Sequence, residues 1–145
     1  MFQHASAVHI IMNMLSLVAL APAVALLYNQ FEYLIGYFVA GLVGSFANTI
    51  YATNTVTVGA SGAICCMMGM LLVGALISEQ RRYVNLESVM GAVILMLVNT
   101  FMSRGVSISG HIGGLIGGVI VGLIFIVFQK LFKNRSQCNA YYQND

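Results

Sequence analysis

The chain has 145 residues, of which 59% are hydrophobic and 7% are charged, and its mean hydropathy is +0.89. A soluble domain of this size has too much surface for its volume to bury that much apolar side chain, so we expect lipid to surround most of it. The net charge of +2, without basic residues interleaved with aromatic ones, argues against a nucleic-acid partner.

Five apolar stretches predict five transmembrane helices, because a span needs about 20 mainly apolar residues to cross roughly 30 Å of hydrocarbon. The stretches are residues 5–28, 33–51, 59–78, 86–102 and 108–128. The single proline, Pro22, should kink the first helix rather than end it. We therefore expect an all-α, polytopic membrane protein, with a membrane domain at 1–128 and a loosely ordered, cytoplasmic polar tail at 129–145.

The basic residues predict the orientation of these helices. Five of them follow the third or the fifth helix and therefore lie on one side of the membrane: Arg81, Arg82, Lys130, Lys133 and Arg135. Arg104 lies on the other side. The positive-inside rule then places the C-terminus in the cytoplasm and residue 1 outside. We expect an integral, multi-pass protein of a bacterial cell membrane.

Polar residues inside the spans fall at one depth. The first, third and fifth helices run inward, and each carries polar residues near its outer start: His9 and Asn13, then Ser61, then His111. Polar groups in hydrocarbon are costly, so their convergence from three distant segments indicates a functional site in the outer part of the membrane.

The histidines and cysteines do not predict a metal site. His4 and His9 are five residues apart and point away from each other on a helix, and no carboxylate is near enough to complete a site. Cys65 and Cys66 are adjacent in an apolar run, and Cys138 lies in the polar tail. With no CxxC or CxxH spacing, we expect neither a disulfide framework nor a metal, and no cofactor.

The fifth helix is rich in glycine at regular spacing. Its glycines recur every four residues along two adjacent rows: Gly110, Gly113, Gly114, Gly117, Gly118 and Gly122. Each glycine costs a helix interior about 1 kcal/mol relative to alanine, and close helix-to-helix approach is the usual compensation in a membrane. Residues 59–63 of the third helix offer a matching small-residue surface. If the two surfaces pack, Ser61 and His111 come within hydrogen-bonding reach.

This pair predicts a Ser–His dyad. Serine is a weak nucleophile until a base takes its proton, and His111 is the candidate base for Ser61. An acidic third member is absent, because the carboxylates fall on the cytoplasmic side or in the tail: Glu32, Glu79, Glu87 and Asp145. Removing the acid from a Ser–His–Asp enzyme costs about 10⁴ in turnover, so we expect slow catalysis. Asn13, His9 and the Ser61 backbone N–H are the available oxyanion donors.

Three segments in this order, "HASAVHIIMN", "GASGA" and "GHIGGLIGG", resemble the rhomboid family of intramembrane serine proteases, and the match covers about residues 1–128. The resemblance implies a six-helix core that cleaves transmembrane segments of other membrane proteins within the bilayer. It implies that Ser61 is the nucleophile and His111 the base, and that His9 and Asn13 are oxyanion donors. Three further residues would lie near the site in structural roles: His4, Gly59 and Gly62.

The chain departs from the family pattern in two places. The family's core begins one helix earlier, with a long outer loop that carries a Trp-Arg element, whereas this chain has no tryptophan. We therefore expect a fragment or a truncated product. The fourth residue after the nucleophile is often an aromatic that stacks on the catalytic histidine. Here it is Cys65, so His111 lacks that support.

The fourth helix would flank the substrate entrance in the family. We interpret its Asn99 and Thr100 as ordinary polar residues of a helix end. Two other functions stay open: a catalytically inactive rhomboid-like protein that binds transmembrane helices, and a transporter or channel with a histidine proton path. A transporter would call for membrane-buried carboxylates or broken helices in symmetric halves, and the sequence has neither.

Overall fold

The computed structural model describes residues 6–51, 60–102 and 107–142, and these ranges form helices with no strand among them. In chain order the elements are α1 (Ala7–Leu27), α2 (Gln30–Tyr51), α3 (Ser61–Ile77), the short 3₁₀ helix η1 (Glu79–Tyr83), α4 (Leu86–Met102) and α5 (Ile108–Tyr142). Helix α1 continues through Pro22. The predicted all-α architecture is confirmed.

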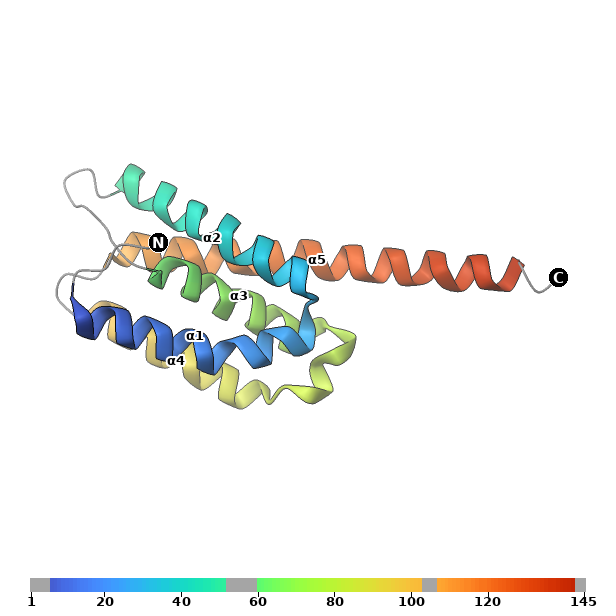
Figure 1. Ribbon diagram of the computed structural model, residues 1–145, viewed down its shortest axis with the longest axis horizontal. Coiled ribbons are helices and arrows are strands. Elements are labelled where there is room, and N and C mark those ends of the chain that lie inside the picture. The colour runs from blue at the N-terminus through green and yellow to red at the C-terminus, as the bar shows by residue number, and fades with distance from the viewer. Residues whose placement is uncertain (1–5, 52–59, 103–106, 143–145) are drawn as a thin grey trace.

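Helix α5 differs from the expectation, because it does not end at residue 128 but continues to Tyr142. Figure 1 shows it projecting far beyond the other helices toward the C-terminus. The expected loosely ordered tail is therefore helical over residues 129–142. No glycine or proline follows Gly122 to interrupt the helix, and the stacked rings of Phe128 and Phe132, with centroids 6.3 Å apart, continue its apolar side.

Within the described part of the chain, two helical segments are long and apolar enough to cross a membrane, Ala7–Leu27 and Ile108–Phe132. Helices α3 and α4 have 17 residues each. At 1.5 Å per residue each is about 26 Å long, near the lower limit for a span. That α2, α3 and α4 also cross the membrane stays a prediction.

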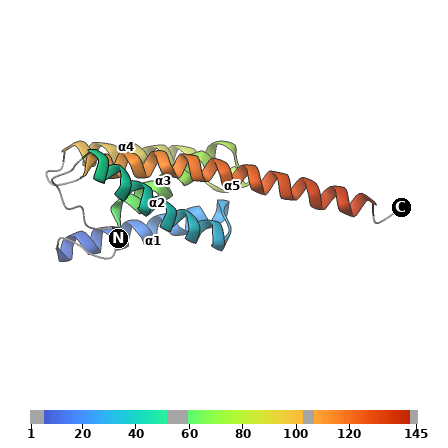
Figure 2. The same cartoon turned by 90° about the horizontal axis from the view of Figure 1, so that it is seen from above.

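Helices that are consecutive in the chain run in opposite directions, so α1, α3 and α5 are parallel to one another. The first residues of α1, α3 and α5 and the last residues of α2 and α4 lie together at one end of the bundle, as both views show (Figure 1, Figure 2). Ser61 is the first residue of α3, so we call this end the Ser61 end. The connection through η1 lies at the opposite end, which we call the η1 end.

Helix α3 is the centre of the bundle, and it packs against α5 most extensively and also against α2, α1 and α4. Its Cys66, Met67 and Met70 are completely buried. The outer helices instead expose large apolar side chains, among them Val18 on α1, Leu42 on α2 and Leu95 on α4. In such a bundle the backbone N–H and C=O groups are hydrogen-bonded within the helices, and the exposed surface is made of apolar side chains. Both features suit a protein surrounded by lipid.

The contact between α3 and α5 is backbone against backbone. A Cβ atom added at Gly114 would collide with the carbonyl group of Gly62, and one added at Gly118 would collide with that of Cys66. One turn further along, a Cβ at Gly122 would lie 3.1 Å from the Cα of Met70. The three pairs share one parallel register, so the glycine row of α5 lies directly on the backbone of α3.

Polar contacts fix the η1 end of the bundle. The hydroxyl of Tyr28, at the end of α1, donates a 2.9 Å hydrogen bond to the Met70 carbonyl of α3. Gln129 of α5 donates to Glu32 of α2 over 2.7 Å and to the Leu27 carbonyl of α1 over 3.3 Å. Together these bonds join α5 and α3 to the α1–α2 turn.

Helix α4 is the least embedded helix, because it packs mainly on α3 and touches α5 only lightly. Gly91 on α4 is exposed, and an added Cβ would meet nothing within 4 Å.

Two glycine-to-alanine variants should therefore have opposite effects. Gly118→Ala should lower the free energy of unfolding by about 1–3 kcal/mol, because the new methyl group forces α5 away from α3. Gly91→Ala adds the same methyl group in open space and should leave stability unchanged or raise it by at most about 1 kcal/mol. Denaturant unfolding in detergent, followed by circular dichroism, measures both. Equal stability of the two variants would show that the α3–α5 contact is not as close as described.

Candidate active site

Ser61 lies at an unusual helix start. The other four α-helices begin with a side-chain oxygen that accepts a hydrogen bond from a backbone N–H of the first turn: Ser6, Asn29, Asn85 and Ser107. Helix α3 begins after Ala60, whose methyl group cannot accept one. The first N–H groups of a helix have no partner within it and carry partial positive charge. The half-buried Ser61 thus lies where an anion would be stabilised.

His111 lies in the first turn of α5, where its backbone N–H donates to the Ser107 carbonyl over 3.1 Å. Gly114, one turn later, packs on the backbone of Gly62. This contact aligns the first turns of the two helices side by side. The structure thus places Ser61 and His111 at the same end of the most closely packed helix pair. That their side chains come within hydrogen-bonding reach of each other stays a prediction.

The α1 residues lie at the same end. Asn13 is buried, 5% exposed, and its amide nitrogen donates a 2.9 Å hydrogen bond to the carbonyl of His9, one turn earlier. The amide has a second hydrogen, which this bond leaves available in principle for another acceptor. His9 is close enough to His111 to interact electrostatically. The polar residues of α1 and α5 therefore lie at the same end of the bundle, although these two helices, as described, do not pack directly on each other.

Thr100 is the residue whose place the sequence interpretation missed. It is not an ordinary helix-end residue, because it is 1% exposed and its Oγ1 lies 2.8 Å from Nδ1 of His111. The same oxygen lies 2.8 Å from the Met96 carbonyl. The short connector after α4 was the available signal, since it brings the last turn of α4 beside the first turn of α5.

The remaining candidates are placed as follows. Gly62 lies in the first turn of α3, against α5, whereas His4 and Gly59 lie outside the described residues. The three glutamates are in the first turns of α2, η1 and α4, at the η1 end, so no described carboxylate lies beside His111. Among the described residues, no three His, Cys, Asp or Glu side chains are grouped as metal ligands.

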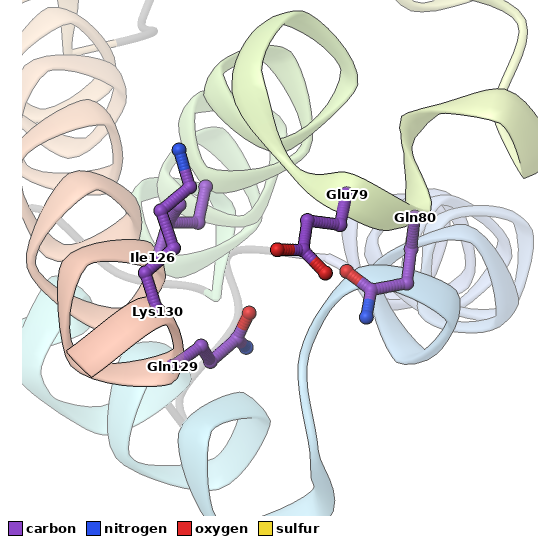
Figure 3. Close-up of a pocket in the computed structure, with 5 residues that line it drawn as sticks. All are labelled: Glu79, Gln80, Ile126, Gln129 and Lys130. Atoms are coloured by element: carbon purple, nitrogen blue, oxygen red, sulfur yellow. The ribbon is translucent and has the colours of Figure 1, made fainter. Parts of the chain in front are cut away.

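A pocket of about 130 Å³ opens at the η1 end, and none of the predicted catalytic or oxyanion residues lines it. Figure 3 shows Glu79 and Gln80 of η1 facing Ile126, Gln129 and Lys130 of α5. The candidate site therefore lies at the other end of the bundle from this pocket.

Comparison with known proteins bears on the same segments. The Rhomboid domain family model matches residues 1–128, which include α1 to α4 and most of α5. The chain belongs to the rhomboid family. It is similar to the rhomboid protease GluP of Bacillus subtilis (strain 168), with 34% identity over 113 residues, 76% of this chain. Those residues are 22% of that protein, so the chain spans about a fifth of its relative's length. No solved structure matches the chain.

The burial pattern predicts a difference in thiol reactivity between position 61 and the cysteines of α3. Cys65 and Cys66 are 2% and 0% exposed, whereas Ser61 is only half-buried. In a Cys138→Ser background, Ser61→Cys should react with a water-soluble maleimide at least about tenfold faster than the native thiols, because only exposed thiols form accessible thiolates. The matched control is the Cys138→Ser chain itself, and equal labelling of both proteins would contradict an accessible position 61.

Proposed function

We propose that this chain is an intramembrane serine endopeptidase in which Ser61 is the nucleophile and His111 is the general base. Membership of the rhomboid family supports the proposal, as does similarity to a protein named a rhomboid protease. The observation that carries it is the Gly62–Gly114 contact, which aligns the turn that bears Ser61 with the turn that bears His111.

In the proposed reaction, Oγ of Ser61 attacks the carbonyl carbon of the scissile peptide bond while Nε2 of His111 accepts the hydroxyl proton. The tetrahedral intermediate collapses when His111 gives that proton to the leaving amine. Water, deprotonated in turn by His111, then releases the acyl group from Ser61. Because no described carboxylate supports the histidine, we expect this dyad to turn over slowly.

The negative charge on the intermediate needs preorganised donors. The backbone N–H of Ser61 at the uncapped start of α3 is the first, and the second amide hydrogen of Asn13 is another. We propose His9, whose carbonyl accepts the Asn13 bond one turn earlier on α1, as a third. These donors come from α1 and α3. The proposed oxyanion site therefore requires the start of α1 to lie at the Ser61 end.

We propose transmembrane segments of other membrane proteins as substrates, and the outer face of the membrane as the location of the Ser61 end. Arg81 and Arg82 lie in η1, and Lys130 lines the pocket at that same end, so the positive-inside rule places the η1 end in the cytoplasm. A helical substrate satisfies its own carbonyl groups, so it has to unwind locally before Ser61 reaches one.

Ser61→Ala and His111→Ala should each abolish cleavage of a transmembrane substrate, a loss of at least about 10³-fold, because neither half of the dyad works alone. Labelling by a fluorophosphonate, in which the serine oxygen displaces fluoride from phosphorus, should be lost in parallel. Circular dichroism should show unchanged helix content. Near-normal cleavage by either variant would refute the dyad, and a folded wild-type chain that neither labels nor cleaves would favour a helix-binding protein without catalysis.

Asn13→Ala should lower kcat about 10²–10³-fold with a small change in KM, because an oxyanion donor acts mainly in the transition state. Ser16→Ala is the matched control. Ser16 lies on the same helix, and its hydroxyl likewise donates to a carbonyl four residues earlier, that of Met12, over 2.8 Å. The Ser16 variant should keep its rate. Equal rates for both variants would remove Asn13 from the oxyanion site.

A further inference from the structure

We propose that Thr100 is a positioning residue that holds His111 in the tautomer whose Nε2 is free to act as the base. The inference rests on the proposed function, in which His111 accepts the serine proton. It starts from two contacts of one oxygen atom: Thr100 Oγ1 lies 2.8 Å from the Met96 carbonyl and 2.8 Å from His111 Nδ1.

The number of hydrogens assigns the direction of both bonds. A threonine hydroxyl has a single hydrogen, and a carbonyl oxygen can only accept. The bond to Met96 therefore uses the Thr100 hydrogen, a common arrangement for threonine inside a helix. The contact to the ring is then a bond from Nδ1–H of His111 to a lone pair of Thr100. In a neutral imidazole with Nδ1 protonated, Nε2 carries the lone pair.

The same arrangement suits the protonated ring. When His111 takes a proton at Nε2, Nδ1–H stays a donor, and its bond to Thr100 becomes charge-assisted. Thr100 in turn stays bonded to the Met96 carbonyl. The partial negative charge of that carbonyl oxygen then favours the positive charge on the imidazolium ring. Because Thr100 is 1% exposed, water does not compete for its hydroxyl group. A neutral hydroxyl thus supplies orientation where a soluble triad uses a carboxylate.

The position of Cys65 shows why such support is needed. Cys65 is 2% exposed and lies against Gly114 of α5, where an added Cβ would come within 3.3 Å of the Cys65 Cβ. Its small side chain has no ring to stack on His111. Among the described residues, Thr100 makes the side-chain hydrogen bond that orients the imidazole.

The test compares Thr100→Val, which keeps the shape and removes the hydroxyl, with Thr100→Ser, which keeps the hydroxyl and removes the methyl group. The first readout is the ¹⁵N spectrum of the histidine-labelled 145-residue chain in detergent at about pH 8.5, where an ordinary imidazole is neutral. His111→Gln assigns the signals. The measurement is repeated with Ser61→Ala, so that it does not depend on catalysis. The second readout is the rate of fluorophosphonate labelling.

We expect the wild type and Thr100→Ser to show a proton on Nδ1 of His111. Thr100→Val should move population to the Nε2–H tautomer and slow labelling about tenfold, because one hydrogen bond to the ring is lost. Thr100→Ser should label within about twofold of wild type.

Two outcomes would overturn the proposal. The first is a wild-type ring protonated on Nε2. The second is an equal effect of the two substitutions, which would reduce Thr100 to a packing residue. If the tautomer shifts in Thr100→Val but the wild type does not label, Thr100 orients His111 and the protease proposal fails by itself.

Discussion

The close approach of α3 and α5 is the constraint on which the rest of the structure depends. Glycines on α5 let its backbone lie on the carbonyl groups of Gly62 and Cys66. In a bilayer, apolar side chains gain little by leaving lipid for one another, so van der Waals contact at short range supplies much of the attraction between helices. That contact also fixes the axial register of the pair, and the register decides that residue 111 lies beside the start of α3.

The chemistry at the Ser61 end is built from neutral groups. The described carboxylates lie at the η1 end, and the groups near His111 are amides, hydroxyls, imidazoles and backbone N–H donors. A charged side chain in hydrocarbon is expensive, whereas a hydrogen-bonded neutral group costs far less. The uncapped start of α3 adds positive potential without a formal charge. In the proposed reaction, dipoles rather than formal charges therefore stabilise the transient anion.

Sequence patterns predicted the helices well because long apolar runs define them. The predicted and observed bounds of the first four helices differ by at most three residues. The fifth was predicted too short, since hydropathy falls after residue 128 while no glycine or proline interrupts residues 129–142. His9, Asn13, Ser61 and His111 were singled out because polar residues are conspicuous in apolar helices. That Ser61, His111, Asn13 and His9 carry catalysis stays a proposal.

The short connector after α4 brings Thr100 near α5, but the sequence alone could not show that its hydroxyl faces His111. A threonine near a helix end satisfies its own hydroxyl locally, so its presence there needs no partner. Whether it also faces a neighbour depends on how α4 is rotated about its axis. Packing against α3 decides that rotation, and the apolar period of α4 does not, because apolar residues lie on several of its sides.

Because α4 has few contacts with the rest of the bundle, the Thr100–His111 bond also helps to hold α4 in place. The bond crosses from the least embedded helix to the proposed base, so any displacement of α4 away from α5 breaks it. Linkage makes this dependence reciprocal: whatever stabilises the bonded imidazole also holds α4 against the bundle. A bond of about 1 kcal/mol changes the ratio of attached to displaced α4 by about fivefold. The position of α4 and the protonation of His111 are thus two variables of one equilibrium.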